Sequence, residues 1–149
     1  MKRILKRFDE LTLRELYELL RLRAEIFVVE QNCPYQDLDG LDYEGLHLFY
    51  EEEDGTVIAC LRIFRHPDDD ADTVRIGRVV TKQHGKGLGA LLLHEGVMTA
   101  ETYYCPHRIL LEAQEYAKGF YEKEGFTVVS DMFLEDGIPH VRMEKICQY

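Results

Sequence analysis

The stretch that most limits the possible folds of this chain runs from Thr73 to Thr102. It begins with a β-branched segment, TVRIGRVVT, passes through KQHGKGLGA, and continues as the apolar helical pattern LLLHEGVMTAET, which predicts a strand, a tight loop and a helix. Gly85, Gly87 and Gly89 remove side chains where backbone amides could approach an anion, and a helix N-terminus adds unsatisfied N–H groups and partial positive charge. The pattern indicates a loop for a polyanion such as a diphosphate, although a plain helix-entry turn accounts for the spacing of the glycines equally well.

The composition fits one globular domain over residues 1–149. The chain is 46% hydrophobic and 31% charged, so it is large and apolar enough to bury a core. Its net charge of -10 argues against nonspecific binding to nucleic acid and favours a basic partner or an amine substrate. An anionic ligand would then be held by local amides, with Lys82 and Lys86 nearby.

The cysteines and the hydropathy pattern indicate the cellular setting. Cys33, Cys60, Cys105 and Cys147 lie far apart without metal-type spacing, so we expect reduced packing residues and no metal site. No segment resembles a leader sequence, and no apolar run approaches the roughly 20 residues that cross a bilayer. We therefore expect a cytoplasmic protein with no membrane partner.

Local patterns near the start of the chain predict a strand and an amphipathic helix. The strand covers residues 3–8, and Thr12 followed by Glu15 has the spacing of a capping box, so a helix begins there. Helical spacing assigns five apolar residues to its inward face: Leu13, Leu16, Leu20, Ala24 and Phe27.

A loop and a hairpin follow. Residues 31–45 are polar, contain Pro and Gly and have no sustained period, which predicts an ordered loop or a short irregular helix; loops of this length are often functional. Residues 47–51 and 57–65 predict two antiparallel strands joined by a turn at 53–55. The acidic residues 66–72 are expected to form a solvated loop.

The last third of the chain predicts a strand, a helix and a strand pair. The strand covers residues 108–113, and the helix that follows ends at Gly125. Residues 126–133 and 140–146 are predicted to pair around a turn at 135–137. The whole order predicts an α/β domain (α+β mixed) with a mixed sheet, in which the central strand–helix–strand unit places two parallel strands side by side.

Three motifs in this order resemble the GCN5-related N-acetyltransferase (GNAT) family, and within it the ElaA-like branch. The family's cofactor motif is Arg or Gln, two residues, Gly, one residue, then Gly or Ala, and HGKGLG from His84 to Gly89 occupies that frame. The pair Ala113–Gln114 with the later GFYEKEGF resembles the family's strand end and following helix, and RAEIFVVEQNCPYQDLDGLD resembles the ElaA-like branch. His84 departs from the usual Arg or Gln, and the segment before Gly85 is shorter than the common pattern.

The resemblance implies a central mixed sheet that is splayed, is flanked by helices and holds acetyl-CoA, with no metal. The pantetheine arm would bond to a strand edge as an added strand does, and the pyrophosphate would lie on the loop amides. The implied cofactor contacts are Val79, Val80, Thr81, His84, Gly85, Lys86, Gly87, Leu88, Gly89, Ala90 and Gln114.

The resemblance also implies direct transfer of an acetyl group to a primary amine of a small molecule or peptide. Tyr121 matches the family's general acid, and a tyrosine with an unperturbed pKa of about 10 is protonated at neutral pH. An alkylamine is almost wholly protonated there, so the reaction needs a base or a water chain.

The base and the acceptor contacts stay open. Glu112, His47 and His140 are candidate bases, each with a structural alternative as an ion-paired carboxylate or a hydrogen-bonded histidine. Glu30, Tyr35 and Asp39 belong to or adjoin the loop that, by resemblance, covers the acceptor site, and their carboxylates would favour a cationic amine.

Two other functions are compatible with the same residues. The chain could bind acyl-CoA as a non-catalytic or regulatory module, or it could be a protein-interaction module without a cofactor, which makes poor use of the glycine loop. Small domains of this fold often pair through their last strands, so a homodimer is also possible.

Overall fold

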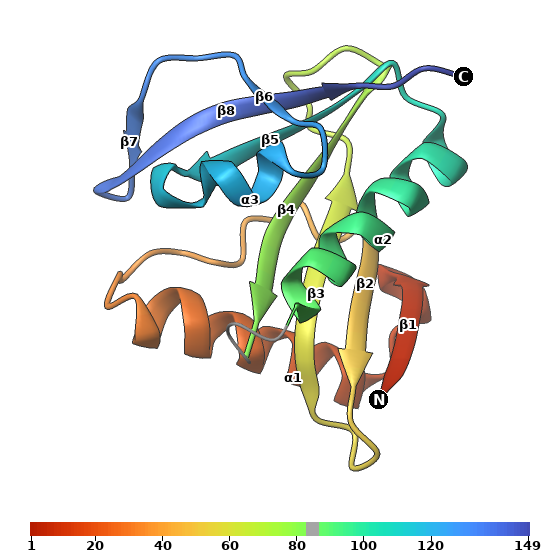
Figure 1. Cartoon of the computed structure of the whole chain (residues 1–149). Coiled ribbons are helices and arrows are strands. Elements are labelled where there is room, and N and C mark those ends of the chain that lie inside the picture. The colour runs from red at the N-terminus through yellow and green to blue at the C-terminus, as the bar shows by residue number, and fades with distance from the viewer. Residues whose placement is uncertain (83–86) are drawn as a thin grey trace.

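The computed structural model describes residues 1–82 and 87–149, which fold around one eight-stranded sheet (Figure 1). The strands are β1 (Lys2–Arg7), β2 (Leu46–Glu51), β3 (Val57–Phe64), β4 (Thr73–Thr81), β5 (Arg108–Gln114), β6 (Thr127–Val128), β7 (Phe133–Glu135) and β8 (Ile138–Ile146). The helices are η1 (Phe8–Glu10), α1 (Leu13–Arg23), η2 (Ala24–Glu30), α2 (Leu88–Tyr104), η3 (Glu115–Ala117) and α3 (Lys118–Glu122).

The sheet is mixed, as predicted. Its order is β1-β2-β3-β4-β5-β8-β6, and β7 also pairs with β8. β4 and β5 are parallel, and the other pairs are antiparallel. The predicted hairpin of β2 and β3 is confirmed, and Gly55 supplies the positive φ of 88° at its turn. The predicted α/β class and the central parallel pair are therefore both confirmed.

Helices cover both faces of the sheet (Figure 1). α1 packs on β3 and β4 over a small core that includes Leu22, Ile26 and Phe49. α2 lies on the other face over a larger core, to which Phe120 and Tyr121 of α3 add their rings. Each helix thus buries one apolar stripe against the sheet.

The capping box at the start of α1 is confirmed, but its predicted inward face is only partly right, since Leu16, Leu20 and Phe27 are partly buried and the other two residues are exposed. The Thr12 hydroxyl accepts from the Glu15 amide at 3.0 Å, while the Glu15 carboxylate accepts from the Thr12 amide at 2.8 Å. Leu13 is 88% exposed, and Ala24 is also exposed. The buried stripe is instead Leu19, Leu22, Arg23 and Ile26. A buried arginine belongs to this stripe, so a search for apolar spacing misplaces the face.

α1 continues directly into η2, which is a π-helical turn. The Gln31 amide donates to the Ile26 carbonyl at 3.2 Å, and the Cys33 amide donates to the Val28 carbonyl at 3.1 Å. Such wide turns occur frequently at functional sites. The chain then runs through residues 31–45 without a regular helix or strand, in agreement with the predicted ordered loop.

The predicted strand over residues 126–133 is wrong as one element. It is divided into β6 and β7, which pair with different parts of β8. Between them the Ser130 hydroxyl accepts the Arg142 amide at 2.8 Å, so a side chain takes the place of a ladder bond. The predicted turn at 135–137 is confirmed, with φ of 51° at Asp136 and 77° at Gly137, the conformation of a tight hairpin turn.

Two further sequence expectations can be compared with the described residues. Within residues 1–82 and 87–149, no helix combines the length and apolar character needed to cross a membrane. All four cysteines are free thiols; Cys33, Cys60 and Cys147 are buried as expected for packing residues, whereas Cys105 is exposed.

Candidate active site

The parallel strands β4 and β5 separate part-way along their length. They pair only from Thr73 to Arg75 on β4 and from Arg108 to Leu110 on β5. Beyond these residues β4 stays paired with β3, and β5 stays paired with β8 as far as Gln114. Within the described part of the chain, residues 76–80 have no strand partner on the β5-facing edge of β4. Backbone groups on such an edge need another hydrogen-bonding partner.

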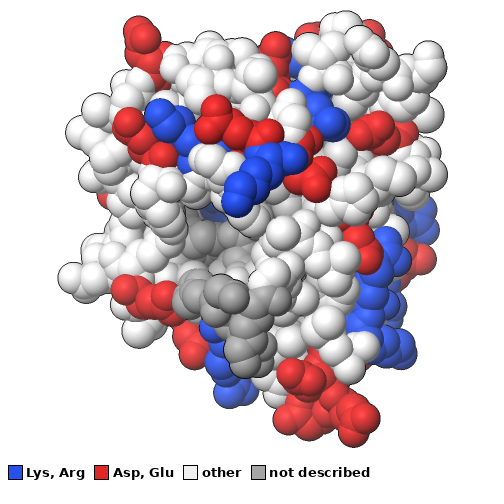
Figure 2. Space-filling view, in the orientation of Figure 1, with Lys and Arg blue, Asp and Glu red and all other residues white. Residues whose placement is uncertain are grey.

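A cavity of about 820 Å³ lies at this separation. It is lined by β4 and β5, by the first turn of α2, by α3, by the segment 31–45, and by the hairpin of β7 and β8. Figure 2 shows the molecule hollowed between the part that carries α3 and the part that carries α1. Elements from both faces of the sheet therefore meet around one cavity.

β4 carries a bulge beside the cavity. Its register with β3 shifts between Cys60 and Arg62, and Arg78 has a φ of 52°. This left-handed conformation is uncommon for arginine. The Nε atom of Arg78 lies 2.7 Å from Oδ1 of Asp37, so the bulge directs the guanidinium toward the segment 31–45.

The N-terminus of α2 also borders the cavity. Gly87 is its N-cap, with a φ of 75° and no side-chain hydrogen bond to cap the helix. Gly87, Gly89 and Ala90 all line the cavity. Exposed first-turn amides and the helix dipole suit an anionic group.

α3 brings Tyr121 into the lining of the cavity. Its ring packs edge-on against Phe120 and Phe126, with centroids 5.1 and 6.3 Å away. The Tyr121 hydroxyl makes no hydrogen bond to any residue within 1–82 or 87–149. Burial raises the pKa of Tyr121, so its hydroxyl keeps its proton at neutral pH.

The segment 31–45 is held against the sheet by two buried arginines and one partly buried arginine. Three arginines, one each from α1, β3 and β4, bind three aspartates of the segment. The ion pairs join Arg23 to Asp37 and Asp42, Arg62 to Asp39 and Asp42, and Arg78 to Asp37 and Asp39. Because arginines already neutralise these three aspartates, the segment 31–45 offers an acceptor less negative charge than its sequence suggests.

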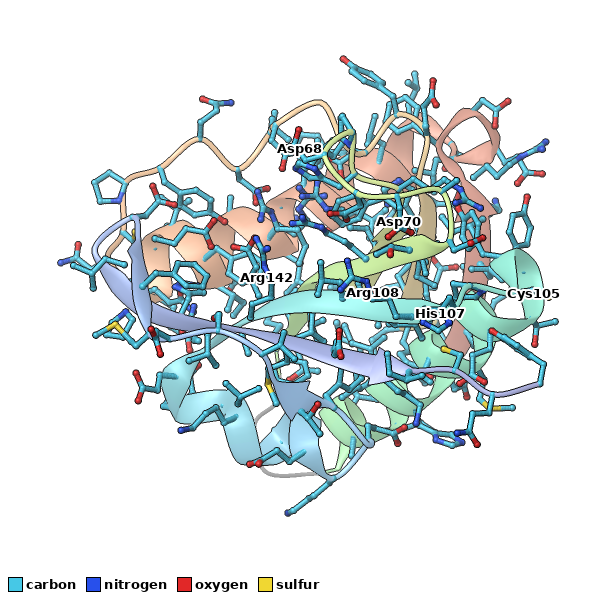
Figure 3. All side chains as sticks on the ribbon, turned by 90° about the horizontal axis from the view of Figure 1, so that it is seen from above. Asp68, Asp70, Cys105, His107, Arg108 and Arg142 are labelled. Carbon is cyan, nitrogen blue, oxygen red and sulfur yellow. The ribbon has the colours of Figure 1, made fainter. Side chains whose placement is uncertain are left out.

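Polar residues cover the face of β5 and β8 that points away from α2 and α3. Successive residues of a strand alternate between faces, so Leu111 belongs to the core and Glu112 lies on this polar face. Glu112 Oε1 lies 3.1 Å from Nη1 of Arg75 and 3.5 Å from Nη2 of Arg142. Figure 3 shows Arg142 and Arg108 along this face.

Comparison with known proteins agrees with this geometry. The sequence model of the acetyltransferase (GNAT) domain matches residues 24–147. The chain belongs to the GNAT acetyltransferase family. Protein ElaA of Escherichia coli is 39% identical over 141 residues, covering 92% of this chain and 91% of that protein.

Solved structures of GNAT relatives superpose closely. An acyl-CoA N-acyltransferase from Pseudomonas aeruginosa has a TM-score of 0.89 and 39% sequence identity, over 97% of this chain and 99% of that one. Escherichia coli ElaA also has a TM-score of 0.89, with 34% identity in the structural alignment and the same coverage. The predicted splayed GNAT sheet is therefore confirmed.

Most residues expected to hold the GNAT cofactor surround the cavity. The ones that line it are Val79, Val80, Thr81, Gly87, Gly89, Ala90 and Gln114. Leu88 is instead buried in the core beneath them. His84, Gly85 and Lys86 lie outside the described residues. Gln114 Nε2 donates to Gln31 Oε1 at 3.2 Å, which joins the end of β5 to the segment 31–45.

The residues expected to contact the acceptor are placed less uniformly. Tyr35 and Asp39 line the cavity, but the exposed Glu30 is not part of the described lining. The Tyr35 hydroxyl donates to Asp37 Oδ1 at 3.0 Å. Burial acts to raise the pKa of Asp39, but hydrogen bonds from Arg62 and the Leu41 amide and the charges of Arg62 and Arg78 together outweigh it and hold that pKa well below its usual range.

The three candidate bases also differ in position. Glu112 and His140 line the cavity, whereas His47 does not belong to its described lining. His47 is buried with its Nε2 2.9 Å from the Asp42 carbonyl oxygen, and burial lowers its pKa. Its surroundings are those of a hydrogen-bonded structural histidine.

Sequence reasoning missed two sets of residues in the lining. One is the pair of arginines, Arg62 on β3 and Arg78 on β4, that hold the segment 31–45 and show no local sequence pattern. The other is Glu135, which precedes the β7–β8 turn and lies in the same cavity as Glu112 and His140. In the sequence Glu135 begins the turn Glu135-Asp136-Gly137, a pattern that indicates a hairpin and gives no sign of a functional carboxylate.

Proposed function

We propose that this GNAT protein transfers an acetyl group from acetyl-CoA directly to a primary amine of a small molecule or peptide. The observation that carries the proposal is the separation of β4 from β5, which opens a cavity between an uncapped helix N-terminus and the Tyr121 side chain. The strand edge of β4 suits the pantetheine arm of the cofactor, and the N-terminus of α2 suits its pyrophosphate.

Acetyl-CoA fits the chemistry of these groups. The pantetheine arm carries amides, which match the backbone edge of β4 over residues 76–80, where β5 is no longer paired with it. The pyrophosphate matches the amides at the start of α2, where Gly87 and Gly89 allow close approach. When bound, acetyl-CoA supplies an activated acyl thioester.

In this proposal Tyr121 is the general acid. Tyr121 lines the cavity, its hydroxyl has no hydrogen-bond partner among the described residues, and its raised pKa keeps it protonated. It would donate its proton to the thiolate sulfur that leaves when the acyl group is transferred. The hydroxyl would therefore act at the sulfur atom, where negative charge develops as the thiolate leaves.

The acceptor would approach from the face that carries the segment 31–45 and the β7–β8 hairpin. These two elements meet where Cys33 Sγ lies 3.5 Å from the carbonyl oxygen of Asp136. The amine must be uncharged when it attacks, so a group on this side has to accept a proton.

The test combines binding with turnover. Isothermal titration with CoA measures affinity, and a thiol-release assay with acetyl-CoA follows transfer across a panel of polyamines, aminoglycosides and peptides. Binding with amine-dependent thiol release supports the enzyme. CoA binding without release for any amine would make the chain a non-catalytic acyl-CoA module, and absence of CoA binding would overturn the proposal.

A further inference from the structure

The carboxylates that line the cavity differ in whether an arginine already holds them. Asp39 is paired with Arg62 and Arg78, and Glu112 is paired with Arg75 and Arg142. Glu135 has no Lys or Arg partner within residues 1–82 and 87–149. A carboxylate without a cation partner is better able to accept a proton than one fixed in an ion pair.

Glu135 is rigidly placed for such a role. It is the last residue of β7 and is paired with Ile138 across a two-residue turn. The carbonyl oxygen of Asp136 accepts from Cys33 Sγ at 3.5 Å, so the turn is joined to the segment 31–45 across the cavity. The side chain is half exposed and lies within the cavity lining. Glu135 can thus meet an acceptor that enters between the hairpin and the segment.

His140 supports Glu135 from the neighbouring strand. His140 Nδ1 lies 2.7 Å from the Ile138 carbonyl oxygen, which can only accept, so Nδ1 carries the hydrogen. Nε2, the other ring nitrogen, lies 3.6 Å from Glu135 Oε2, which places the ring beside the carboxylate without a direct hydrogen bond. The ring is stacked on Phe133, with centroids 6.0 Å apart, and this fixes its orientation.

The surroundings of Glu135 favour proton uptake. Burial raises the pKa of Glu135, and the carboxylate of Glu112 on β5 raises it further. His140 on β8 opposes this, while Asp136 in the same turn adds to it. Arg75 reaches Glu112 and is itself held by Asp69 at 2.7 Å, so the neighbouring Glu112 is fixed in place.

We propose that Glu135 is the general base that takes the proton of a cationic primary-amine acceptor, with His140 as a positioning residue. This inference rests on the acetyltransferase function proposed above. The ammonium gives one proton to the Glu135 carboxylate, and the freed nitrogen lone pair forms the bond to the thioester carbonyl carbon. The carbon–sulfur bond breaks with its electron pair on sulfur, which takes the proton of Tyr121. A second nitrogen proton restores Tyr121, and Glu135 returns its proton to water.

The first test is Glu135→Gln, which keeps the shape of the side chain and removes its basicity. We expect kcat/KM for alkylamines to fall about 10²- to 10⁴-fold, with CoA affinity by titration unchanged. The acidic limb of the pH profile should be lost in the variant. Glu144→Gln is the matched control, because Glu144 is a carboxylate on β8 that pairs with Arg108 and is not among the described lining residues.

A second measurement separates base catalysis from a structural role. Acceptors that are already uncharged at the assay pH, such as hydrazides or aromatic amines, need no base before attack. The defect of Glu135→Gln should largely disappear with these acceptors, whereas a distorted site would leave them equally slow. His140→Gln should shift the acidic limb of the alkylamine pH profile without removing it.

The outcomes distinguish this inference from the proposed function. If the wild type binds CoA and acetylates alkylamines while Glu135→Gln does so at the same rate, the base assignment is overturned. An equal defect with charged and uncharged acceptors also overturns it. If the wild type acetylates no amine at all, the proposed function fails and the base role fails with it.

Discussion

Arg62 holds the carboxylate of Asp39 in two hydrogen bonds, 2.8 Å from Nη1 to Oδ1 and 2.7 Å from Nη2 to Oδ2. This bidentate geometry is among the stronger ion pairs available to side chains. Asp39 therefore acts mainly to fasten the segment 31–45 onto β3. A cationic acceptor would therefore need another carboxylate that no arginine holds. Glu135 of the β7–β8 hairpin is such a carboxylate among the described residues.

Replacing Asp42 tests how far the ion pairs between the arginines and the segment 31–45 stabilise the fold. Asp42 accepts from Arg23 Nη1 at 2.8 Å and from Arg62 Nη1 at 3.1 Å, and both guanidinium side chains are only 3% exposed. Asp42→Ala leaves each of these two buried guanidinium groups with one carboxylate partner in place of two, so we expect the free energy of unfolding to fall by about 3 kcal/mol. Urea denaturation followed by circular dichroism measures this loss.

Asp9→Ala is the matched control for Asp42→Ala. Asp9 pairs with Arg7 at 3.7 Å on the surface, and such exposed pairs contribute about 0–1 kcal/mol. Equal losses in the two variants would mean that the buried pairs contribute no more than surface ones.

The same ion pairs make stability depend on acidic pH. Burial acts to raise the pKa of Asp42, but hydrogen bonds and charge from Arg23, with the charge of Arg62, outweigh it and lower that pKa. A carboxyl whose pKa is lowered by folding stabilises fully above its unfolded pKa of about 3.9 and loses this contribution as the pH falls toward the folded value. We expect Tm to drop steeply below about pH 4.

Asp42→Asn checks the source of that pH dependence. The variant should have a lower Tm at neutral pH and a shallower decline in acid than the wild type. If Tm fell equally with falling pH in the variant and in the wild type, the acid sensitivity would come from other carboxylates.

Local sequence patterns predicted most of the fold and several of the residues that line the cavity beside α2. The glycine motif, the capping box of Thr12 and Glu15, and the hairpin turns are all short-range signals, since each depends on a few adjacent residues. The strand–helix–strand order then gives the parallel pair directly.

The acceptor end could not be predicted in the same way. Arg23 pairs with Asp42 from 19 residues away, and Cys33 meets Asp136 from 103 residues away. Contacts of this range leave no periodicity in the sequence. Gly77 in TVRIGRVVT is compatible with a bulge, but nothing in the sequence marks the arginine after it as the left-handed residue.

Replacing Gly87, the N-cap of α2, tests the end of the cavity that is proposed to hold CoA. The φ of 75° at Gly87 is strained for any L residue, although an added Cβ would have nothing within 4 Å. Gly87→Ala should therefore lower stability by about 1–2 kcal/mol through backbone conformation alone, and it should weaken CoA binding by shifting the first turn of α2. Isothermal titration and urea denaturation give the two readouts.

Gly119→Ala provides the comparison for Gly87→Ala. Gly119 also has open space around its Cβ position, but its backbone is helical in α3 and its φ is not positive. Alanine there should stabilise the protein by about 0.5–1 kcal/mol and leave CoA affinity unchanged. If both variants behaved alike, the left-handed N-cap would have no special role in binding.

Tyr121→Phe tests the general acid. The variant keeps the ring contacts to Phe120 and Phe126 and removes only the hydroxyl, so stability and CoA affinity should be preserved. We expect kcat to fall about 10²-fold or more, because the leaving thiolate loses its proton donor. Since burial raises the pKa of Tyr121, the alkaline limb of the wild-type pH–rate profile should lie above the usual tyrosine range and be absent in the variant.

Tyr104→Phe, at a half-buried tyrosine of α2, controls for loss of a hydroxyl as such. Unchanged turnover in Tyr121→Phe, with CoA affinity intact, would remove the acid role and leave protonation of the thiolate to water.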